Sequence, residues 1–576
     1  MNLNYDYGIM RIYYLVLKIL LSSPVLFSST GVSSNAPSVI FYAGIGEADF
    51  GEDPHAVHGI GTSDGGYLVV GKSLDISGSS DAFALKVVPN NWSGYLHLSP
   101  PSEASNATWS WSLARGESGK QDGFNQVAEV GSALFLAGFK GMSDGSEDSW
   151  LVKVDSSTGG VIWEHTLSES QSGTSSAFEV VHATFQGGLI TGGVTEAEKG
   201  GLEGFKSYGN PSSGTAFVAY YGPSLVQASS MPSAPTWYQN LSDSLTVKAV
   251  RPIGNTGEFM VLTSGVNYPH EAMLKKLDSQ GSLLWSKSYP SRGEPTDLCV
   301  IKKDGEPQGF AFCGHGGKTS GILDSYLTGL DLNGTIQWSQ EFGDPVGGVD
   351  KFAGLGAGNP LLIYDESWGI QATDDGGMIV ASGTGIEGCQ PWQGTDANQT
   401  RISILNECQA DPRNDWRGMI TKFDQNGNMV WQRVDSFLSP EGDATVSSAC
   451  EYVSITSDGK LLSVNDEAFG VGILVLEAEI SSSPNIFSTS GTALSGNWRS
   501  SDWFGSYFPT ASGWIYHLNH GWIYSLAGSL NSIWFWKEDS GWLWTTQSFY
   551  PWTWFHQGQS WKYFNSSNST WSAGYN

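Results

Sequence analysis

The sequence predicts an all-β protein in which one unit of four antiparallel strands is repeated. The first supporting observation is an Asp-Gly-Gly turn between two apolar runs, found at Asp64–Gly66 and again at Asp375–Gly377. The second is a turn of Asp, Gly and Trp that recurs in four segments, which are Asp155–Trp163, Asp278–Trp285, Asp331–Trp338 and Asp424–Trp431. Glycine and asparagine accept the positive φ that such tight hairpin turns require. A hairpin of one design repeated along the chain is typical of a repeat fold.

Length and composition agree with this prediction. The chain has 576 residues, so we expect two folded units or one large repeat assembly rather than a single ordinary core. It contains 73 glycines, with 12% aromatic and only 15% charged residues. This mixture favours short strands and tight turns over long helices, and no window shows sustained helical spacing of apolar residues.

The repeated unit has the size of a propeller blade, since four antiparallel strands occupy about 50 residues. Six tryptophans mark the ends of six blades, and these are Trp111, Trp163, Trp237, Trp285, Trp338 and Trp431. A seventh unit, residues 449–480, has three strands but no closing tryptophan strand. The segment Phe41–Phe50 matches the segments that follow the blade-end tryptophans, so it can supply the missing strand. The sequence therefore predicts a seven-bladed β-propeller over residues 38–480, closed by the N-terminal strand.

The tryptophan turn resembles the blade-docking motif of the quinoprotein-like (PQQ-like) repeat β-propellers of bacteria. In that motif three residues separate Asp from Gly and three separate Gly from Trp, as they do at Asp155, Gly159 and Trp163. The other three copies are one residue shorter between Asp and Gly. The resemblance covers residues 38–480, and it implies that the six blade-end tryptophans have the structural role of docking neighbouring blades.

A quinone-cofactor (PQQ-type) dehydrogenase is the alternative function that this resemblance implies. The sequence lacks the adjacent cysteine pair that such enzymes often place beside the cofactor, and no calcium site with a base can be assembled. His517 and His520 are three residues apart, and on a strand they would point to opposite faces, which argues against shared metal ligation. We therefore expect no cofactor, no catalytic set and no metal site.

The composition changes at the C-terminal end of the chain. Residues 481–496 are rich in Ser, Thr and Gly and predict a linker. Residues 497–576 hold half of the 24 tryptophans, and aromatic pairs recur two residues apart in six places: Trp514/Tyr516, Trp522/Tyr524, Trp534/Trp536, Trp542/Trp544, Trp552/Trp554 and Trp561/Tyr563. Residues i and i+2 share one face of a strand, so we expect a small antiparallel β domain with an aromatic ladder on one face.

Two interpretations of this ladder remain open. The simpler one is that the rings form the core of the domain. The other is that surplus rings stay exposed and stack on a ligand, with Trp514, Trp522, Trp542 and Trp552 as the candidates. Three short segments resemble the Trp-rich tails of exported marine-bacterial proteins and, more loosely, the repeats of cell-wall- and glucan-binding modules. They are Gly513–Tyr516, Gly521–Tyr524 and Gly541–Trp544. This resemblance implies attachment to a surface.

The N-terminus and the cysteines indicate an exported protein. Residues 1–36 combine Arg11 and Lys18 with the apolar stretch Ile12–Phe27, which predicts a signal peptide or, alternatively, an N-terminal anchor. Five cysteines fit an oxidising compartment, and the expected bridges are Cys299–Cys313 across a hairpin and Cys389–Cys408 around an insertion. Cys450 is expected to be a buried thiol outside any disulfide.

The net charge of −28 would repel nucleic acid and anionic membrane surfaces. Together with the export signal, the blade repeats and the lack of a catalytic set, this predicts a secreted or cell-surface protein without enzymatic activity, which binds partners or serves as a scaffold. The propeller would recognise a protein or a glycan, and the aromatic tail would attach the molecule to a surface.

Overall fold

The computed structural model of the chain describes residues 36–46, 52–74, 80–89, 107–167, 173–199, 211–267, 270–303, 305–316, 324–343, 363–386, 416–435, 437–438, 445–446, 448–467, 470–478, 492–509, 514–529 and 532–573. No helix within these ranges is long and apolar enough to cross a membrane. Residues 1–35 and 479–491, together with Cys389 and Cys408, fall outside the described residues. The export signal, the second disulfide and the linker up to residue 491 therefore stay predictions, whereas Thr492 and Ala493 at the end of the predicted linker form a strand of the tail sheet.

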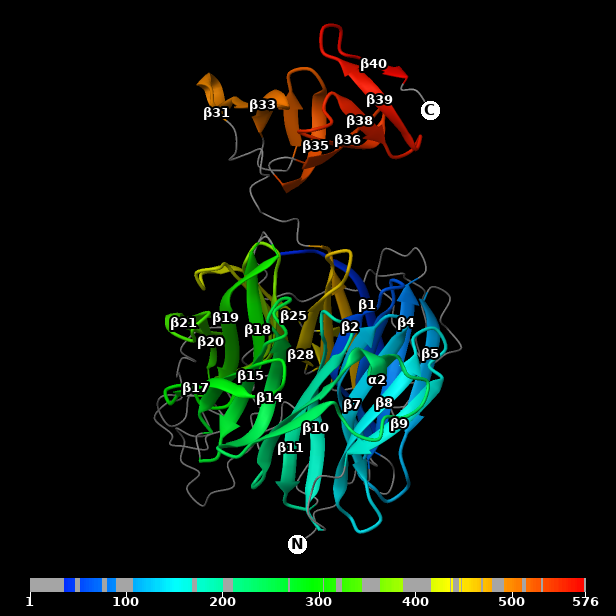
Figure 1. Cartoon of the computed structure of the whole chain (residues 1–576), viewed down its shortest axis with the longest axis vertical. Coiled ribbons are helices and arrows are strands. Elements are labelled where there is room, and N and C mark those ends of the chain that lie inside the picture. Colours follow the sequence, from blue (N-terminus) through cyan, green and yellow to red (C-terminus); the bar gives the residue numbers. More distant parts are fainter. Residues whose placement is uncertain are drawn as a thin grey trace, which may run out of the picture.

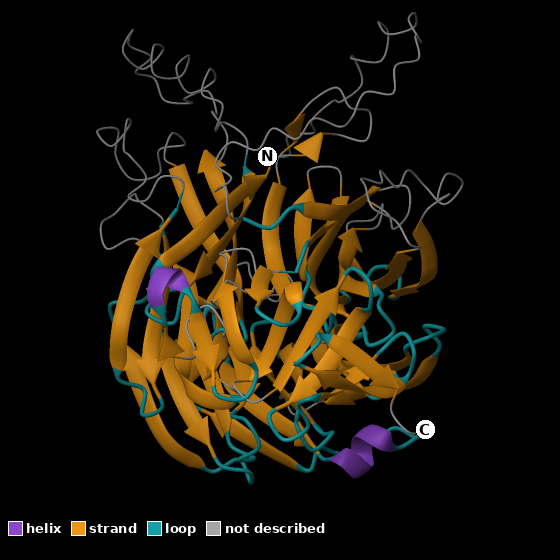
Figure 2. Ribbon diagram, turned by 90° about the horizontal axis from the view of Figure 1, so that it is seen from above, coloured by secondary structure: helices purple, strands orange, loops and turns teal. Residues whose placement is uncertain are grey.

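Seven four-stranded antiparallel sheets form the propeller, and strands make up nearly all of its regular structure (Figures 1 and 2). In blades 1 to 6 the strands follow chain order from the inside of the ring outward. Blade 1 consists of β2 (Glu52–Gly61), β3 (Tyr67–Leu74), β4 (Ser80–Pro89) and β5 (Ala107–Arg115), and blade 2 of β6 (Gly123–Val130), β7 (Ala133–Gly141), β8 (Glu147–Asp155) and β9 (Val161–Leu167). Blade 3 consists of β10 (Ser175–Ala183), β11 (Leu189–Ala197), β12 (Thr215–Tyr221) and β13 (Trp237–Leu241), and blade 4 of β14 (Ser244–Pro252), β15 (Phe259–Gly265), β16 (Ala272–Leu277) and β17 (Leu283–Tyr289). Blade 5 consists of β18 (Pro295–Lys303), β19 (Glu306–His315), β20 (Ser325–Asp331) and β21 (Ile336–Phe342), and blade 6 of β22 (Ile363–Ala372), β23 (Met378–Ile386), β24 (Arg417–Phe423) and β25 (Met429–Asp435).

Blade 7 closes the ring with a strand from the other end of the chain. It consists of β28 (Ser448–Ile455), β29 (Leu461–Glu467), β30 (Gly470–Leu476) and the N-terminal strand β1 (Val39–Gly46). β1 pairs antiparallel with β30, in a register that places Tyr42 opposite Leu474. The predicted seven blades and the closure by the N-terminal strand are thus confirmed. Within the described part of residues 36–478, the helix α2 (Pro223–Gln227) and the short strands β26 (Phe437–Leu438) and β27 (Thr445–Val446) lie outside the blades.

The position of a strand within its blade explains its sequence pattern. β7 is a nearly continuous apolar run and is buried at all but one position, because blades cover both of its faces. β17 lies at the outer edge of blade 4, where it exposes five of its seven residues, and its pattern is accordingly more polar.

The blade-end tryptophans contact the turn of the next blade. Trp111 of blade 1 donates its indole N–H to the carbonyl of Ser156 at 3.0 Å, and a Cβ atom on Gly159 would lie 2.5 Å from its ring. Trp338 repeats this arrangement with the carbonyl of Gln425 at 3.2 Å and with Gly427 beneath the ring. The Asp-Gly-Trp turn therefore has a glycine because the indole of the preceding blade occupies the place of a side chain.

The remaining four blade-end tryptophans show how this contact varies. Trp237 and Trp285 likewise lie over the turn glycines of the following blades. Trp163 donates instead to the carbonyl of Ala228 at 3.2 Å, just after α2, because blade 3 has no Asp-Gly-Trp turn. Trp431 packs in an apolar cluster with Leu474 of blade 7. The outermost strand of blade 7 comes from the N-terminus, so no Asp-Gly-Trp turn leads into it.

A second recurring feature is a β-bulge in every inner strand. In each blade at least one residue of the inner strand is skipped in the pairing with the second strand, and these include Val57, Asn125, Glu179, Lys248, Thr296, Trp368 and Glu451. A bulge bends its strand and re-aims the side chain. Opposite three of the bulges a glycine approaches closely, since a Cβ atom on Gly71, Gly138 or Gly193 would lie 1.9 Å from a backbone oxygen of the inner strand.

The C-terminal residues form a separate ten-stranded antiparallel sheet in which each strand pairs with the next (Figure 1). Its strands are β31 (Thr492–Ala493), β32 (Arg499–Ser501), β33 (Gly505–Pro509), β34 (Trp514–His517), β35 (Gly521–Ser529), β36 (Ser532–Lys537), β37 (Gly541–Thr546), β38 (Trp552–Phe555), β39 (Ser560–Asn565) and β40 (Thr570–Ala573), with a 3₁₀ turn at Ser495–Asn497. The cluster of buried apolar side chains in this sheet draws only on residues of the tail.

The predicted disulfide between Cys299 and Cys313 is wrong. Both residues are buried free thiols, and Cys299 is paired across the hairpin with Ala311 rather than with Cys313. The hairpin turns between Lys303 and Glu306, before the midpoint of the two cysteines, so the two side chains are out of register. Burial raises the pKa of Cys313 to about 12, which keeps this thiol protonated. Cys450 is a buried thiol, as predicted.

The contact opposite the bulge gives a test of the blade architecture. Replacing Gly138 by Ala should force its methyl group against the carbonyl of Gly123 and lower the stability of the propeller by roughly 1–3 kcal/mol. The matched control is Gly418→Ala, because a Cβ atom there would find its nearest neighbour at 3.5 Å. Calorimetric unfolding of both variants checks this, and equal thermal midpoints would contradict it.

Candidate functional site

The aromatic pairs of the tail lie on one face of its sheet, and this face is open to solvent. Along β34 the side chains alternate, with Trp514 half-buried, Ile515 buried and Tyr516 exposed. The same alternation runs through β35 to β38, where Trp522 is 54% exposed and Trp552 is 39% exposed. The interpretation of these rings as the core of the domain is therefore wrong.

The core on the opposite face comes from residues between or next to the paired aromatics. They are mainly aliphatic or phenylalanine side chains, namely Ile515, Ile523, Ile533, Phe535, Leu543 and Phe555. The apolar residue in the middle of four of the six pairs was the sequence signal that could have identified the buried face, whereas Thr553 and Lys562 stand in the other two. The four candidate residues Trp514, Trp522, Trp542 and Trp552 all lie on the open face.

The rings on the open face line up across the strands in two rows, most of whose members are half-buried. The first row runs over β34 to β37, through cross-strand neighbours Trp514, Tyr524, Trp536 and Trp542. The second runs over β36 to β39, through Trp534, Trp544, Trp554 and Trp561. Neighbouring rings support each other, with centroids 5.7 Å apart for Trp514 and Tyr524 and 5.8 Å apart for Trp554 and Trp561. Two further cross-strand pairs on this face are more exposed, Tyr516 with Trp522 and Trp552 with Tyr563. We call the two rows and these two pairs together the aromatic face.

Two histidines lie beneath this sheet. His517 and His520 were expected on opposite faces of a strand, yet their ring centroids are only 4.6 Å apart, because a turn begins after His517. His517 contacts the carbonyl of Phe504 through Nε2 at 2.7 Å and accepts the backbone N–H groups of Asn519 and His520 at Nδ1. Burial lowers the pKa of His517 to about 4, and the two donors at Nδ1 oppose protonation as well.

This geometry makes the tail sensitive to acid. The unfolded chain binds a proton on this imidazole below about pH 6.5, whereas the folded tail binds it only near pH 4. Stability contributed by the neutral histidine is thus complete above pH 6.5 and falls as the pH drops towards 4, by up to roughly 3 kcal/mol.

Hydrogen exchange of β33 to β36 at pH 7 and pH 5, corrected for intrinsic rates, measures the effect. Protection should fall at pH 5 in the native protein and in the control His556→Gln, which changes an exposed histidine. The variant His517→Gln should show a smaller dependence on pH. Equal protection of the native tail at both pH values would refute the assignment.

The propeller has a pocket where four inner strands end. Residues of β10, β14, β18 and β22 and of the turns that follow them line a cavity of 510 Å³. Its wall contains Arg251, which is buried and bonded to Asp297 at 2.7 Å, and Gln371, which donates to the Tyr452 hydroxyl at 2.7 Å. Phe185 stands in one of the turns and is 73% exposed. A pocket with polar walls and an exposed aromatic ring suits a polar ligand that also has an apolar face.

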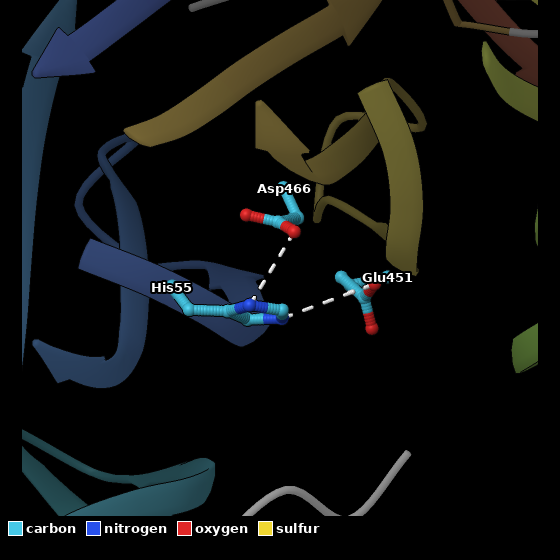
Figure 3. A group of neighbouring side chains, drawn as sticks. All are labelled: His55, Glu451 and Asp466. Carbon is cyan, nitrogen blue, oxygen red and sulfur yellow. Dashed lines mark ion pairs between the residues drawn. The ribbon is translucent and has the colours of Figure 1, made fainter. Parts of the chain in front are cut away.

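A group of potential metal ligands lies where blade 1 meets blade 7. His55 of β2 faces Asp466 of β29 across 3.4 Å, measured from Nδ1 to Oδ2, and faces Glu451 of β28 across 3.9 Å, measured from Nε2 to Oε1 (Figure 3). Among the residues that the structure describes, this is the one group of three such side chains close enough to share an ion. Burial, followed by the nearby Lys72 ammonium, lowers the pKa of His55 to about 3, so its imidazole is neutral.

The fold and these surfaces define a seven-bladed propeller protein with a C-terminal aromatic sheet. No family model and no curated protein matches the chain. Solved structures similar to it include BamB from Moraxella catarrhalis, with 12% identity over 78% of this chain and 99% of that chain, at a TM-score of 0.30. The quinohemoprotein alcohol dehydrogenase of Comamonas testosteroni has 13% identity over 76% of this chain and 68% of that chain, at a TM-score of 0.35.

The WD40 domain of Pan2 from Neurospora crassa is similar as well, with 10% identity over 77% of this chain and 96% of that chain, at a TM-score of 0.39. A quinohemoprotein is among these solved structures, but TM-scores below 0.5 support no particular propeller family. At these identities no function carries over, and the propeller assignment rests on the strand pairing of the chain itself.

Proposed function

We propose that the chain is an exported binding or scaffold protein without enzymatic activity, which attaches to a polysaccharide surface through its tail. The observation that carries this proposal is the position of the aromatic face on the open side of the tail sheet. The tail could bury its aromatic pairs and expose its aliphatic residues by the opposite choice of face. It instead buries the residues of the other face, mainly isoleucine, leucine and phenylalanine, and leaves the paired rings in reach of a ligand.

The physical case for a polysaccharide follows from the shape and chemistry of this face. Exposed aromatic area is costly in water unless a partner covers it. Neighbouring strands lie about 4.8 Å apart, so four rings in a row extend over roughly 15 Å. A row of that length suits an extended chain of sugar rings, whose C–H faces stack on aromatic rings while their hydroxyl groups stay hydrated.

Alanine substitutions of the most exposed rings test the attachment. Trp522→Ala and Trp552→Ala should each weaken binding to insoluble polysaccharides and to the producing cells roughly 2- to 10-fold, because each removes one stacking contact. Leu518→Ala is the matched control, since Leu518 is an apolar residue of the same sheet, 62% exposed, in the turn between β34 and β35. Co-sedimentation with the polysaccharide measures binding. Trp522→Ala and Trp552→Ala proteins that are folded and bind as well as the control would refute the proposal.

The propeller pocket is the proposed site for recognising a soluble glycan or a protein side chain. Phe185→Ala should weaken binding of whichever ligand an array of glycans and metabolites identifies, because it removes the exposed ring at the pocket rim. Leu283→Ala changes a residue on the outer strand β17, 52% exposed, and should leave binding unchanged. Turnover of a ligand would contradict the binding-only function, as would a bound chromophore after addition of pyrroloquinoline quinone and Ca²⁺.

A further inference from the structure

We propose that His55, Glu451 and Asp466 bind a first-row divalent cation such as Zn²⁺ or Mn²⁺ and thereby fasten blade 1 to blade 7. We call these three residues the seam group. The proposal is independent of polysaccharide binding, because the seam group lies in the propeller and the aromatic face in the tail.

The three side chains offer a suitable set of ligand atoms. One atom from each residue lies within 4.8 Å of the others, so their common centre is no more than about 2.8 Å from any of them. Bonds of roughly 2.0–2.2 Å to zinc need each side chain to move inward by less than about 1 Å. One imidazole nitrogen and two carboxylates form a donor set that suits zinc or manganese better than calcium, because calcium prefers sites made of oxygen atoms alone.

The distances within the seam group fit a space for an ion better than a direct hydrogen bond. A nitrogen that donates to a carboxylate usually lies about 2.8 Å away, whereas here the two separations are 3.4 and 3.9 Å. Two ligands of a tetrahedral zinc ion are, in comparison, roughly 3.4 Å apart at the usual bond length.

The fold explains why these residues meet. Glu451 is the bulged residue of β28, and His55 lies between two register shifts of β2, so both side chains are re-aimed from a regular strand. Glu451 is almost completely buried, while the Asp466 side chain is 29% exposed and leaves a route for a cation from solvent. The ammonium of Lys72 lies near His55 and partly offsets the charge of the carboxylates, so it lowers the affinity of the seam group for a cation.

The test uses the full chain stripped with a chelator and then titrated with zinc chloride or manganese chloride alone. Calorimetric titration should show one cation per chain, and the thermal midpoint of the propeller should rise by several degrees. Hydrogen exchange should slow in β2, β28 and β29, which carry the seam group. His55→Ala and Asp466→Asn should each weaken binding at least tenfold, and Asp466→Asn is the milder change because its site is partly exposed.

Two matched controls separate the seam group from adventitious binding. His165→Gln changes a buried histidine of blade 2, and His556→Ala changes an exposed histidine of the tail. Both should bind the cation as the native chain does. Absorption of Co²⁺ bound in place of zinc gives a second readout, which Asp466→Asn should reduce. The proposal is overturned if neither cation binds at millimolar concentration, or if binding survives His55→Ala and Asp466→Asn.

Discussion

Closure of the ring is the constraint on which the rest of the propeller depends. Seven blades bury their faces only if each has a neighbour on both sides, so the last blade must meet the first. β1 completes blade 7 by pairing with β30, and the seam to blade 1 is then formed by contacts between β2, β28 and β29. The indole-on-turn contacts repeat this joining between successive blades, with variations where a turn is missing.

The sequence was sufficient to predict the architecture because repetition multiplies a weak local signal. The Asp-Gly-Trp turn is short, yet its four copies indicate the length of a blade. The segment Phe41–Phe50 matches the segments after the blade-end tryptophans but has no blade of its own, and this indicated the closure of the ring. The Cys299–Cys313 pairing failed because it assumed a symmetric hairpin, whereas the turn comes earlier and a bulge follows at Gln308. Local irregularities of this kind leave no trace in composition or periodicity.

The candidate sites were less predictable, for two physical reasons. The alternation of residues in the tail showed that the aromatic pairs share a face of the sheet. Either face of a strand can be the buried one, and the choice depends on which face of the whole sheet packs against Phe504. The seam group joins residues near position 55 to residues near position 460, and no spacing in the sequence connects them. Only the closed ring brings them together.

The pairing of β1 with β30 also has a consequence for the order of folding. The two strands are separated by about 430 residues, so β1 is synthesised first but meets its partner only after every other blade exists. Until then β1 is an unpaired apolar strand, and blade 7 is missing its outer edge. We therefore expect the propeller to fold slowly and to be exposed to aggregation while it does, and a truncation within blade 7 would leave β1 without its partner.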